Sequence, residues 1–209
     1  MKNQSDIPLT IGKRETYKNK TTLSGMYSAF MNIPYAIGLL IRNKREKVVA
    51  ESFIERIMLA VTEVNGCAVC SYAHTQLALN QGLSNEEIYA LLSGDSRFIK
   101  PSESKAIFFA QHYAESAGVP DKRSYEAIEM EYGSLKAAII LAAIQLISAG
   151  NAYGIPQSAF KSRLSGKPYK NSSLSYEIGM QTGGIVVLLL ALLHGSIKKM
   201  LGMKHQKFC

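Results

Sequence analysis

Residues 51–82, ESFIERIMLAVTEVNGCAVCSYAHTQLALNQG, decide the fold of this chain. Apolar residues recur at helical spacing up to the Asn65-Gly66 pair, which supplies a stop or a tight turn. The pattern predicts one helix over residues 46–64 and a second over residues 67–81, with Gly82 as the C-terminal cap of the second. Short, well-punctuated turns of this kind indicate a helical protein.

The rest of the chain continues the helical pattern. Ser84 and Glu87 have the spacing of a capping box. The stretch that opens at Ser134 is apolar nearly all the way round, as expected of a central buried helix. No stretch alternates as a strand does, so we predict an all-α fold, a compact multi-helix bundle with an additional apolar C-terminal helix. We also expect a helix over residues 24–40, interrupted near Pro34, and an end at Ser93-Gly94 for the helix that Ser84 caps. A further helix should have Pro101 in its first turn and stop at Gly118. A short helix capped by Asp121 or Ser124 should finish at Gly133.

Composition and punctuation divide the chain into four segments. A length of 209 residues suits one domain with an appendage. The expected segments are a basic N-terminal segment (1–24), a helical domain (25–160), a polar and basic linker (161–176), and an apolar C-terminal helix with a basic tail (177–209).

The apolar C-terminal segment contains twenty residues, 178–197, without Asp, Glu, Lys or Arg. That length is just enough to cross a bilayer. Its glycines and the polar Gln181, Thr182 and His194 favour close protein packing over lipid. We therefore expect this helix to pack in the core or the subunit interface of a soluble homo-oligomer without crossing a membrane, with membrane contact as the less favoured alternative.

The charge distribution sets expectations about partners and location. The formal net charge is +8, but residues 51–160 hold twelve acidic against seven basic residues and contain all the candidate chemistry. The basic residues flank this acidic centre, which favours a solvated surface over a nucleic-acid groove. Three cysteines are too few for a disulfide-stapled secreted fold, and no apolar stretch follows the first basic residues. We expect a cytoplasmic protein that does not bind nucleic acid.

The chemistry of the chain centres on Cys67, Cys70 and His74, which fall on about one face of the expected helix. A CxxC pair at a helix N-terminus can close a disulfide, and the exposed backbone N–H groups there favour the thiolate. His74 lies one turn beyond Cys70 and can take its proton. Glu63 or Glu55, brought back by the turn, would orient that histidine.

Other interpretations of the same residues differ in strength. Two thiolates, an imidazole and a carboxylate also make a plausible zinc set, although structural zinc sites usually need a second paired motif. A c-type haem requires His directly after the second cysteine, where Ser71 stands, so it is excluded. Both cysteines could also be small buried residues without chemistry. No comparable group of residues surrounds the other candidates in the sequence, which are His112, His194, His205 and Cys209. We expect these four to be structural or solvent-facing. No metal and no cofactor is expected.

Glu55, followed after eleven residues by Cys67-Ala68-Val69-Cys70-Ser71-Tyr72-Ala73-His74, resembles the signature of a known family. It is similar to the alkylhydroperoxidase D branch of the carboxymuconolactone decarboxylase-like superfamily, over about residues 25–160. The resemblance implies an all-helical homo-oligomer and a thiol-dependent peroxidase that reduces alkyl hydroperoxides. Its partners would be a hydroperoxide substrate and an external dithiol or protein reductant.

The resemblance also implies individual roles. Cys70 would attack the peroxide, Cys67 would resolve the oxidised cysteine, and His74 with Glu55 would relay protons. Val69 departs from the best-known peroxidases of this branch, which carry a further histidine between the cysteines. From the residues alone we expect Cys70 to lie deeper in the helix and Cys67, at the turn, to be better exposed to a reductant.

Two other function classes remain open at this level. One is a decarboxylase or related lyase, which in this superfamily generally lacks the cysteine pair. The other is a non-enzymatic, oligomeric redox-sensing protein in which the pair switches conformation without turnover. Under the leading hypothesis, Cys67 and Cys70 form a reversible disulfide and Cys209 stays outside it.

Overall fold

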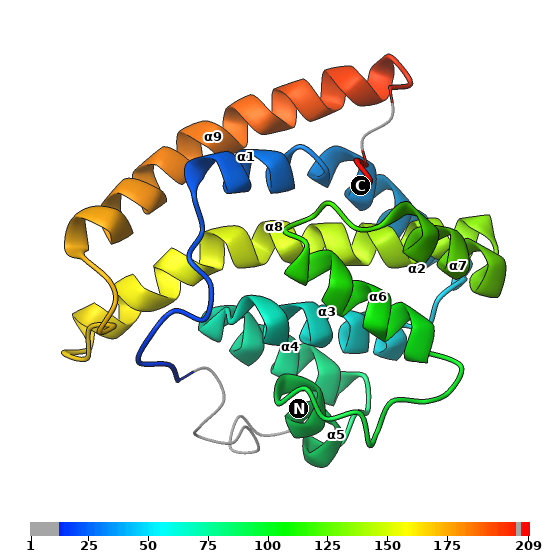
Figure 1. Ribbon diagram of the computed structural model, residues 1–209, viewed down its shortest axis with the longest axis horizontal. Helices are drawn as coiled ribbons and strands as arrows, with labels where there is room; N and C mark the ends of the chain where they lie inside the picture. Colours follow the sequence, from blue (N-terminus) through cyan, green and yellow to red (C-terminus); the bar gives the residue numbers. More distant parts are fainter. Residues whose placement is uncertain (1–12, 204–205) are drawn as a thin grey trace.

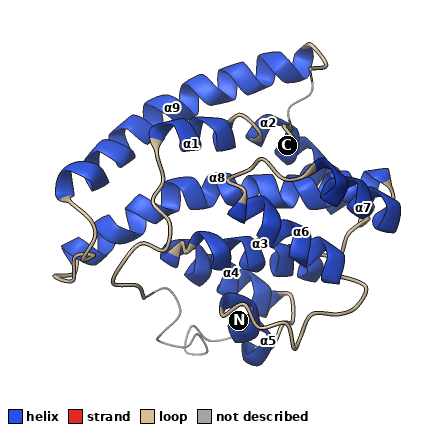
Figure 2. Cartoon of the chain, viewed as in Figure 1, coloured by secondary structure: helices blue, strands red, loops and turns tan. Residues whose placement is uncertain are grey.

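A computed structural model of the protein describes residues 13–203 and 206–209. This part of the chain forms nine helices and no strand, which confirms the predicted all-α fold (Figures 1 and 2). His205 and residues 1–12 of the expected N-terminal segment lie outside the described residues. The helices are α1 (Leu23–Phe30), α2 (Ile33–Glu46), α3 (Glu51–Asn65), α4 (Ala68–Asn80), α5 (Asn85–Leu92), α6 (Ser104–Glu115), α7 (Lys122–Tyr132), α8 (Ser134–Leu164) and α9 (Leu174–Met200).

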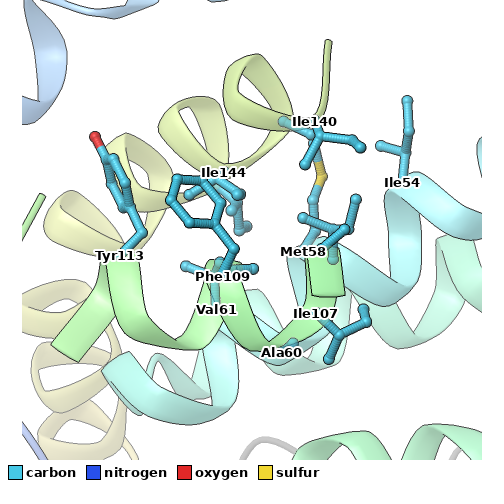
Figure 3. Packing of buried hydrophobic residues seen from close by; sticks show 14 of the residues in the cluster. Ile54, Met58, Ala60, Val61, Ile107, Phe109, Tyr113, Ile140 and Ile144 are labelled. Atoms are coloured by element: carbon cyan, nitrogen blue, oxygen red, sulfur yellow. The ribbon is translucent and has the colours of Figure 1, made fainter. Parts of the chain in front are cut away.

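Helix α8 runs through the middle of the molecule and the other helices pack around it, except α5, which packs on α3 and α4 (Figure 1). Its apolar residues point in nearly every direction, and most of them are buried, as predicted for a central helix. Figure 3 shows Val61 of α3, Phe109 of α6 and Ile144 of α8 meeting in the main core. Burial of such side chains supplies the main driving force for assembling the bundle.

Local capping signals behave largely as predicted. Ser84 and Glu87 form the expected capping box at the start of α5, and Asp121 caps α7 by accepting a hydrogen bond from the backbone N–H of Arg123. Pro101 does not lie in the first helical turn as predicted. It belongs to a separate turn that ends before α6 begins at Ser104.

The break between α2 and α3 corrects one predicted boundary. We expected a helix to begin at Glu46, but Glu46 is the last residue of α2. Lys47 adopts a left-handed conformation with φ of 55°, and the buried Asn43 side chain exchanges two hydrogen bonds with the backbone of Val49. These contacts turn the chain, so α3 begins only at Glu51. The predicted interruption near Pro34 is present, because α1 ends at Phe30 and α2 starts at Ile33.

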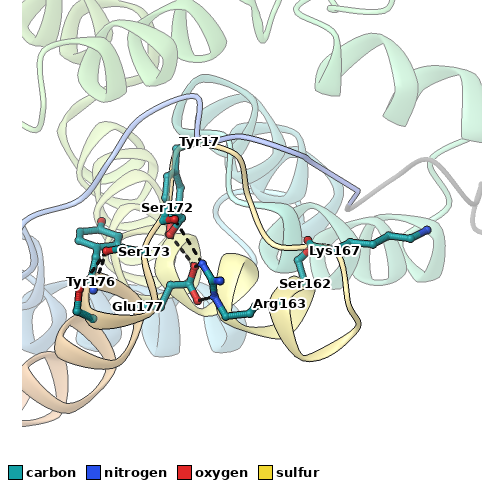
Figure 4. A network of polar contacts seen from close by, with 9 residues as sticks. Tyr17, Ser162, Arg163, Lys167, Ser172, Ser173, Tyr176 and Glu177 are labelled. Carbon is teal, nitrogen blue, oxygen red and sulfur yellow. Dashed lines mark hydrogen bonds and ion pairs between the residues drawn. The ribbon is translucent and has the colours of Figure 1, made fainter.

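The connection between α8 and α9 is shorter than the expected linker over residues 161–176. Helix α8 continues to Leu164 and α9 starts at Leu174, so nine residues, 165–173, join them. Arg163 forms a bidentate ion pair with the fully buried Glu177, and Ser172 donates a hydrogen bond to the same carboxylate (Figure 4). The hydrogen bonds from Arg163 lower the pKa of Glu177. This network ties the start of α9 to the end of α8.

Helix α9 lies along one edge of the molecule against α1, α2 and α8 (Figure 1). By length and composition alone, both α8 and α9 are apolar enough to cross a membrane. The most apolar window of α8 is 67% buried inside the protein, whereas that of α9 is only 22% buried. The expectation that the C-terminal helix packs in the core therefore holds for its inner face only.

Candidate functional site

The turn between α3 and α4 places the cysteine pair. Gly66 ends α3 with φ of 75°, and a Cβ at this position would lie 2.6 Å from Cβ of Lys18, so the turn requires glycine. Cys67 is the N-cap of α4, and Cys70 follows in its first turn. The structure joins the two in a disulfide with their Cα atoms 5.3 Å apart, while Cys209 is free and exposed.

Helix α8 passes directly over this disulfide. A Cβ added to Gly154 would lie 2.6 Å from Sγ of Cys67 and 2.7 Å from Sγ of Cys70, so only glycine permits this approach. One turn later, Ser158 accepts a hydrogen bond from the backbone N–H of Val69 at 3.1 Å and donates one to the carbonyl of Gly154. Ser158 thereby satisfies one of the open N–H groups at the start of α4 and ties that end to α8.

His74 and Glu55 form the second part of the site. Nδ1 of His74 lies 2.9 Å from Oε2 of Glu55, and both side chains are largely buried. Because a carboxylate accepts hydrogen bonds, this contact places the proton of the neutral ring on Nδ1 and leaves Nε2 to accept or deliver another. The structure thus brings together four of the five predicted site residues.

Glu63, the fifth, lies elsewhere. It is two turns beyond Glu55 on α3, and its carboxylate pairs with Nζ of Lys18 at 2.5 Å. The same Lys18 also donates to the backbone carbonyl of Glu63, so this glutamate holds the N-terminal segment against the end of α3. Of the two glutamates that sequence left open, the structure selects Glu55 as the partner of His74.

The exposure of the two cysteines is the reverse of what the sequence predicted. Cys67 is completely buried, whereas Cys70 keeps 9% of its surface exposed. The reason is tertiary: Gly154 of α8 lies against both sulfurs, but only Cys70 also borders the cavity beside α4. Cys70 is the cysteine that lines the neighbouring cavity.

A cavity of about 780 Å³ opens beside Cys70 and His74. Its lining is almost entirely apolar, and among the described residues that line it His74 is the only basic group. Residues from α1, α2, α3, α4, α8 and α9 contribute to the lining; Phe30, Ile33, Met58, Tyr153, Ile185 and Leu188 supply much of its apolar surface. A bulky apolar molecule that enters it would therefore meet Cys70 and His74 together.

Gly154 and Ser158 were not predicted from the sequence. The available signal was a glycine and a serine one turn apart, separated by three residues, within a largely apolar helix, which is typical of close backbone approach. It does not say which segment approaches. Among the described residues, no group of three or more His, Cys, Asp or Glu side chains is arranged to hold a metal ion.

The comparisons with known proteins cover the part of the chain that contains this site. The model of the carboxymuconolactone decarboxylase family matches residues 43–111, a range that contains Glu55, both cysteines and His74. The chain is also similar to an uncharacterized protein, YdfG, of Bacillus subtilis (strain 168), with 29% identity over 126 residues, which cover 56% of this chain and 85% of the relative. No solved structure matches the chain. Over residues 43–111, the chain is thus similar to the carboxymuconolactone decarboxylase family.

Proposed function

We propose that this protein is a thiol-dependent peroxidase that reduces alkyl hydroperoxides through Cys70 and Cys67. The observation that carries the proposal is that Cys70 and His74 line one apolar cavity while Glu55 holds Nδ1 of His74. A nucleophilic sulfur, a base and an orienting carboxylate are thereby arranged around a space for an apolar substrate. The reducing environment of the cytoplasm, where we place the protein, would keep the resting pair available as thiols.

The reaction balances with the residues of this site and one external dithiol. In the reduced protein, Nε2 of His74 takes the proton of Cys70, and the thiolate attacks the terminal oxygen of the hydroperoxide. The O–O bond breaks, Cys70 becomes a sulfenic acid, and the alkoxide leaves as an alcohol with the proton from His74. Cys67 then attacks the sulfur of Cys70, which forms the disulfide and releases water. An external dithiol then reduces this disulfide by thiol–disulfide exchange, which oxidises the dithiol and restores both cysteine thiols.

The positions of the two cysteines support this division of roles. Cys70 has access to the cavity, which is required of the residue that meets the substrate. Cys67 is buried and needs to reach only the sulfur of Cys70, which the short Cα separation allows. An external reductant would accordingly attack from the Cys70 side.

The lyase alternative is less well supported by the cavity. Decarboxylation needs a carboxylate substrate, and a buried carboxylate is normally held by Arg or Lys. The described residues that line the cavity include neither. An apolar hydroperoxide, in contrast, requires no fixed positive charge for binding.

Steady-state consumption of cumene hydroperoxide with dithiothreitol as the recycling dithiol tests the proposal. We expect turnover by the wild-type protein and by Cys209→Ser, and none by Cys70→Ser. Consumption of a single equivalent without turnover would instead favour a redox-sensing protein. Equal turnover by Cys70→Ser would refute the proposed chemistry.

A further inference from the structure

The outer face of α9 carries a continuous apolar surface that nothing in the described chain covers. We call it the α9 stripe; its members are between 47% and 66% exposed, and they are Ile185, Val186, Leu189, Leu190, Leu193 and Ile197. Their spacing places them on one side of the helix, with no charged residue between positions 178 and 197. An exposed apolar surface of this length marks a docking site.

The opposite face of α9 is fixed to the bundle. A Cβ at Gly195 would collide with the backbone oxygen of Met31, and a Cβ at Gly184 would lie 3.1 Å from Sδ of Met26. Together with the buried Ala191, these residues bring α9 close to α1 and the start of α2. Because α9 cannot be surrounded by lipid without losing these contacts, the stripe is suited to lie on a surface rather than to span a membrane.

The charges around the stripe indicate the kind of surface. Residues 161–209 contain eight basic residues and one acidic residue, Glu177, which is buried and paired with Arg163. Lys198 follows the C-terminal end of the stripe, and Lys199 beside it donates a hydrogen bond to the backbone carbonyl of Pro34. Parallel self-association along the stripe would bring these basic C-terminal ends together. An anionic phospholipid surface would instead complement this basic end.

The stripe is continuous with the candidate active site. Ile185 belongs to the stripe and also lines the cavity that contains Cys70 and His74, and Leu188 of α9 lines the same cavity. The apolar lining therefore extends to the exposed surface of α9. A molecule held at a surface that covers the stripe would lie beside the entrance to the cavity.

We propose that the α9 stripe docks on an anionic phospholipid bilayer and that the cavity takes fatty-acyl hydroperoxides directly from it. The substrate class rests on the proposed function, whereas the docking does not. One phospholipid hydroperoxide and the two thiols give one phospholipid alcohol, one water and the disulfide, which the external dithiol reduces again. The charges attract the protein to the bilayer, and the stripe holds it there.

Vesicle flotation tests the docking on the full-length protein. We expect the wild-type protein to float with vesicles of phosphatidylglycerol and phosphatidylcholine, and much less with phosphatidylcholine alone. The double variant Leu189→Glu/Leu193→Glu, at residues outside the cavity, should lose at least about 100-fold in vesicle affinity. Met130→Glu introduces one such charge at an 82% exposed apolar residue of α7 and should bind as the wild type does. Thermal melting of each variant verifies the fold.

Two peroxides separate the docking from the chemistry. The double variant should reduce tert-butyl hydroperoxide in solution at the wild-type rate but should lose at least about tenfold in rate on phospholipid hydroperoxide in anionic vesicles. If no form of the protein reduces tert-butyl hydroperoxide, the proposed function fails, while flotation still decides the docking. Equal rates of both proteins on the vesicle substrate would overturn the lipid route.

Three further outcomes would overturn the docking. They are the absence of wild-type flotation, equal flotation with neutral and anionic vesicles, and unchanged flotation of the double variant. If the wild-type protein is a dimer that does not float, and the double variant is a monomer by light scattering, the stripe is an interface between two copies of this chain.

Discussion

Nδ1 of His74 and Oε2 of Glu55 lie 2.9 Å apart and link α4 to α3 across the turn that carries the cysteine pair. The two residues are nineteen positions apart in the sequence. The contact makes Nε2 the ring nitrogen of His74 that can accept a proton, because a carboxylate partner keeps the proton on Nδ1. It therefore connects the packing of two helices with the acid–base chemistry of the site.

Glu55→Gln should slow the oxidation of the reduced protein by organic hydroperoxide by about 100-fold. The amide of glutamine can donate to Nδ1, which stabilises the tautomer with its proton on Nε2 and removes the base that Cys70 requires. Single-turnover loss of hydroperoxide measures the rate. Glu63→Gln is the matched control on the same helix, and it should leave the rate unchanged because Glu63 pairs with Lys18. Equal effects of both substitutions would contradict the assigned role of Glu55.

Cys67→Ser should still react once with hydroperoxide and accumulate a sulfenic acid on Cys70, because the resolving thiol is absent. Cys70→Ser should not react, since its remaining Cys67 is buried away from the cavity. Trapping with a sulfenic-acid reagent followed by mass spectrometry distinguishes the two variants. A sulfenic acid at Cys67 formed at the wild-type rate in Cys70→Ser would reverse the roles.

Gly154→Ala should destabilise the protein by about 1–3 kcal/mol, because the new methyl group would collide with both cysteine sulfurs and overpack the α4–α8 contact. The control is Gly150→Ala, one turn earlier on α8, where an added Cβ meets nothing within 4 Å. That substitution should be neutral or stabilising by up to about 1 kcal/mol, since alanine is the better helix former. Urea unfolding measures both values, and equal effects would show that α8 does not approach the disulfide closely.

Glu177→Gln should lower the free energy of unfolding at neutral pH by about 3 kcal/mol, because it leaves Arg163 without its buried partner. Because 27% of the Arg163 side chain is exposed, we expect a loss of stability at the lower end of the range for breaking a buried ion pair. The exposed pair of Glu15 and Lys170 provides the control, and Glu15→Gln should have no measurable effect.

The effect of Glu177→Gln should also depend on pH. Hydrogen bonds from Arg163 lower the pKa of Glu177 in the folded protein below its ordinary value of 4.5, so the unfolded chain takes up the proton first. The stabilisation is therefore complete above that ordinary value and is lost as the pH falls through the lower folded-state pKa. Urea unfolding at a series of pH values should show the wild-type protein and the variant converging in acid. A difference that stays constant down to strongly acidic pH would contradict this assignment.

The sequence by itself determined most of the helical framework, because the relevant signals are local. Helical periodicity, the Ser84–Glu87 capping box and the glycine at position 66 act over one or two turns, and the structure contains each of them. The spacing of Cys67, Cys70 and His74 likewise follows from a single helix. Boundaries failed where the deciding contact was made by a side chain some residues away, as with Asn43 and the late start of α3.

The tertiary structure alone decided which glutamate contacts His74 and which cysteine borders the cavity. Glu55 and Glu63 lie eight residues apart on α3, and only the packing of α4 and Lys18 against α3 distinguishes them. Helix α8, more than eighty residues later, passes over both sulfurs at Gly154, and only Cys70 also borders the cavity. The same holds for α9, where a uniformly apolar segment gives no local sign of which face packs. Close contact with α1 buries one side and leaves the other exposed, because burial depends on neighbours that are distant in the sequence.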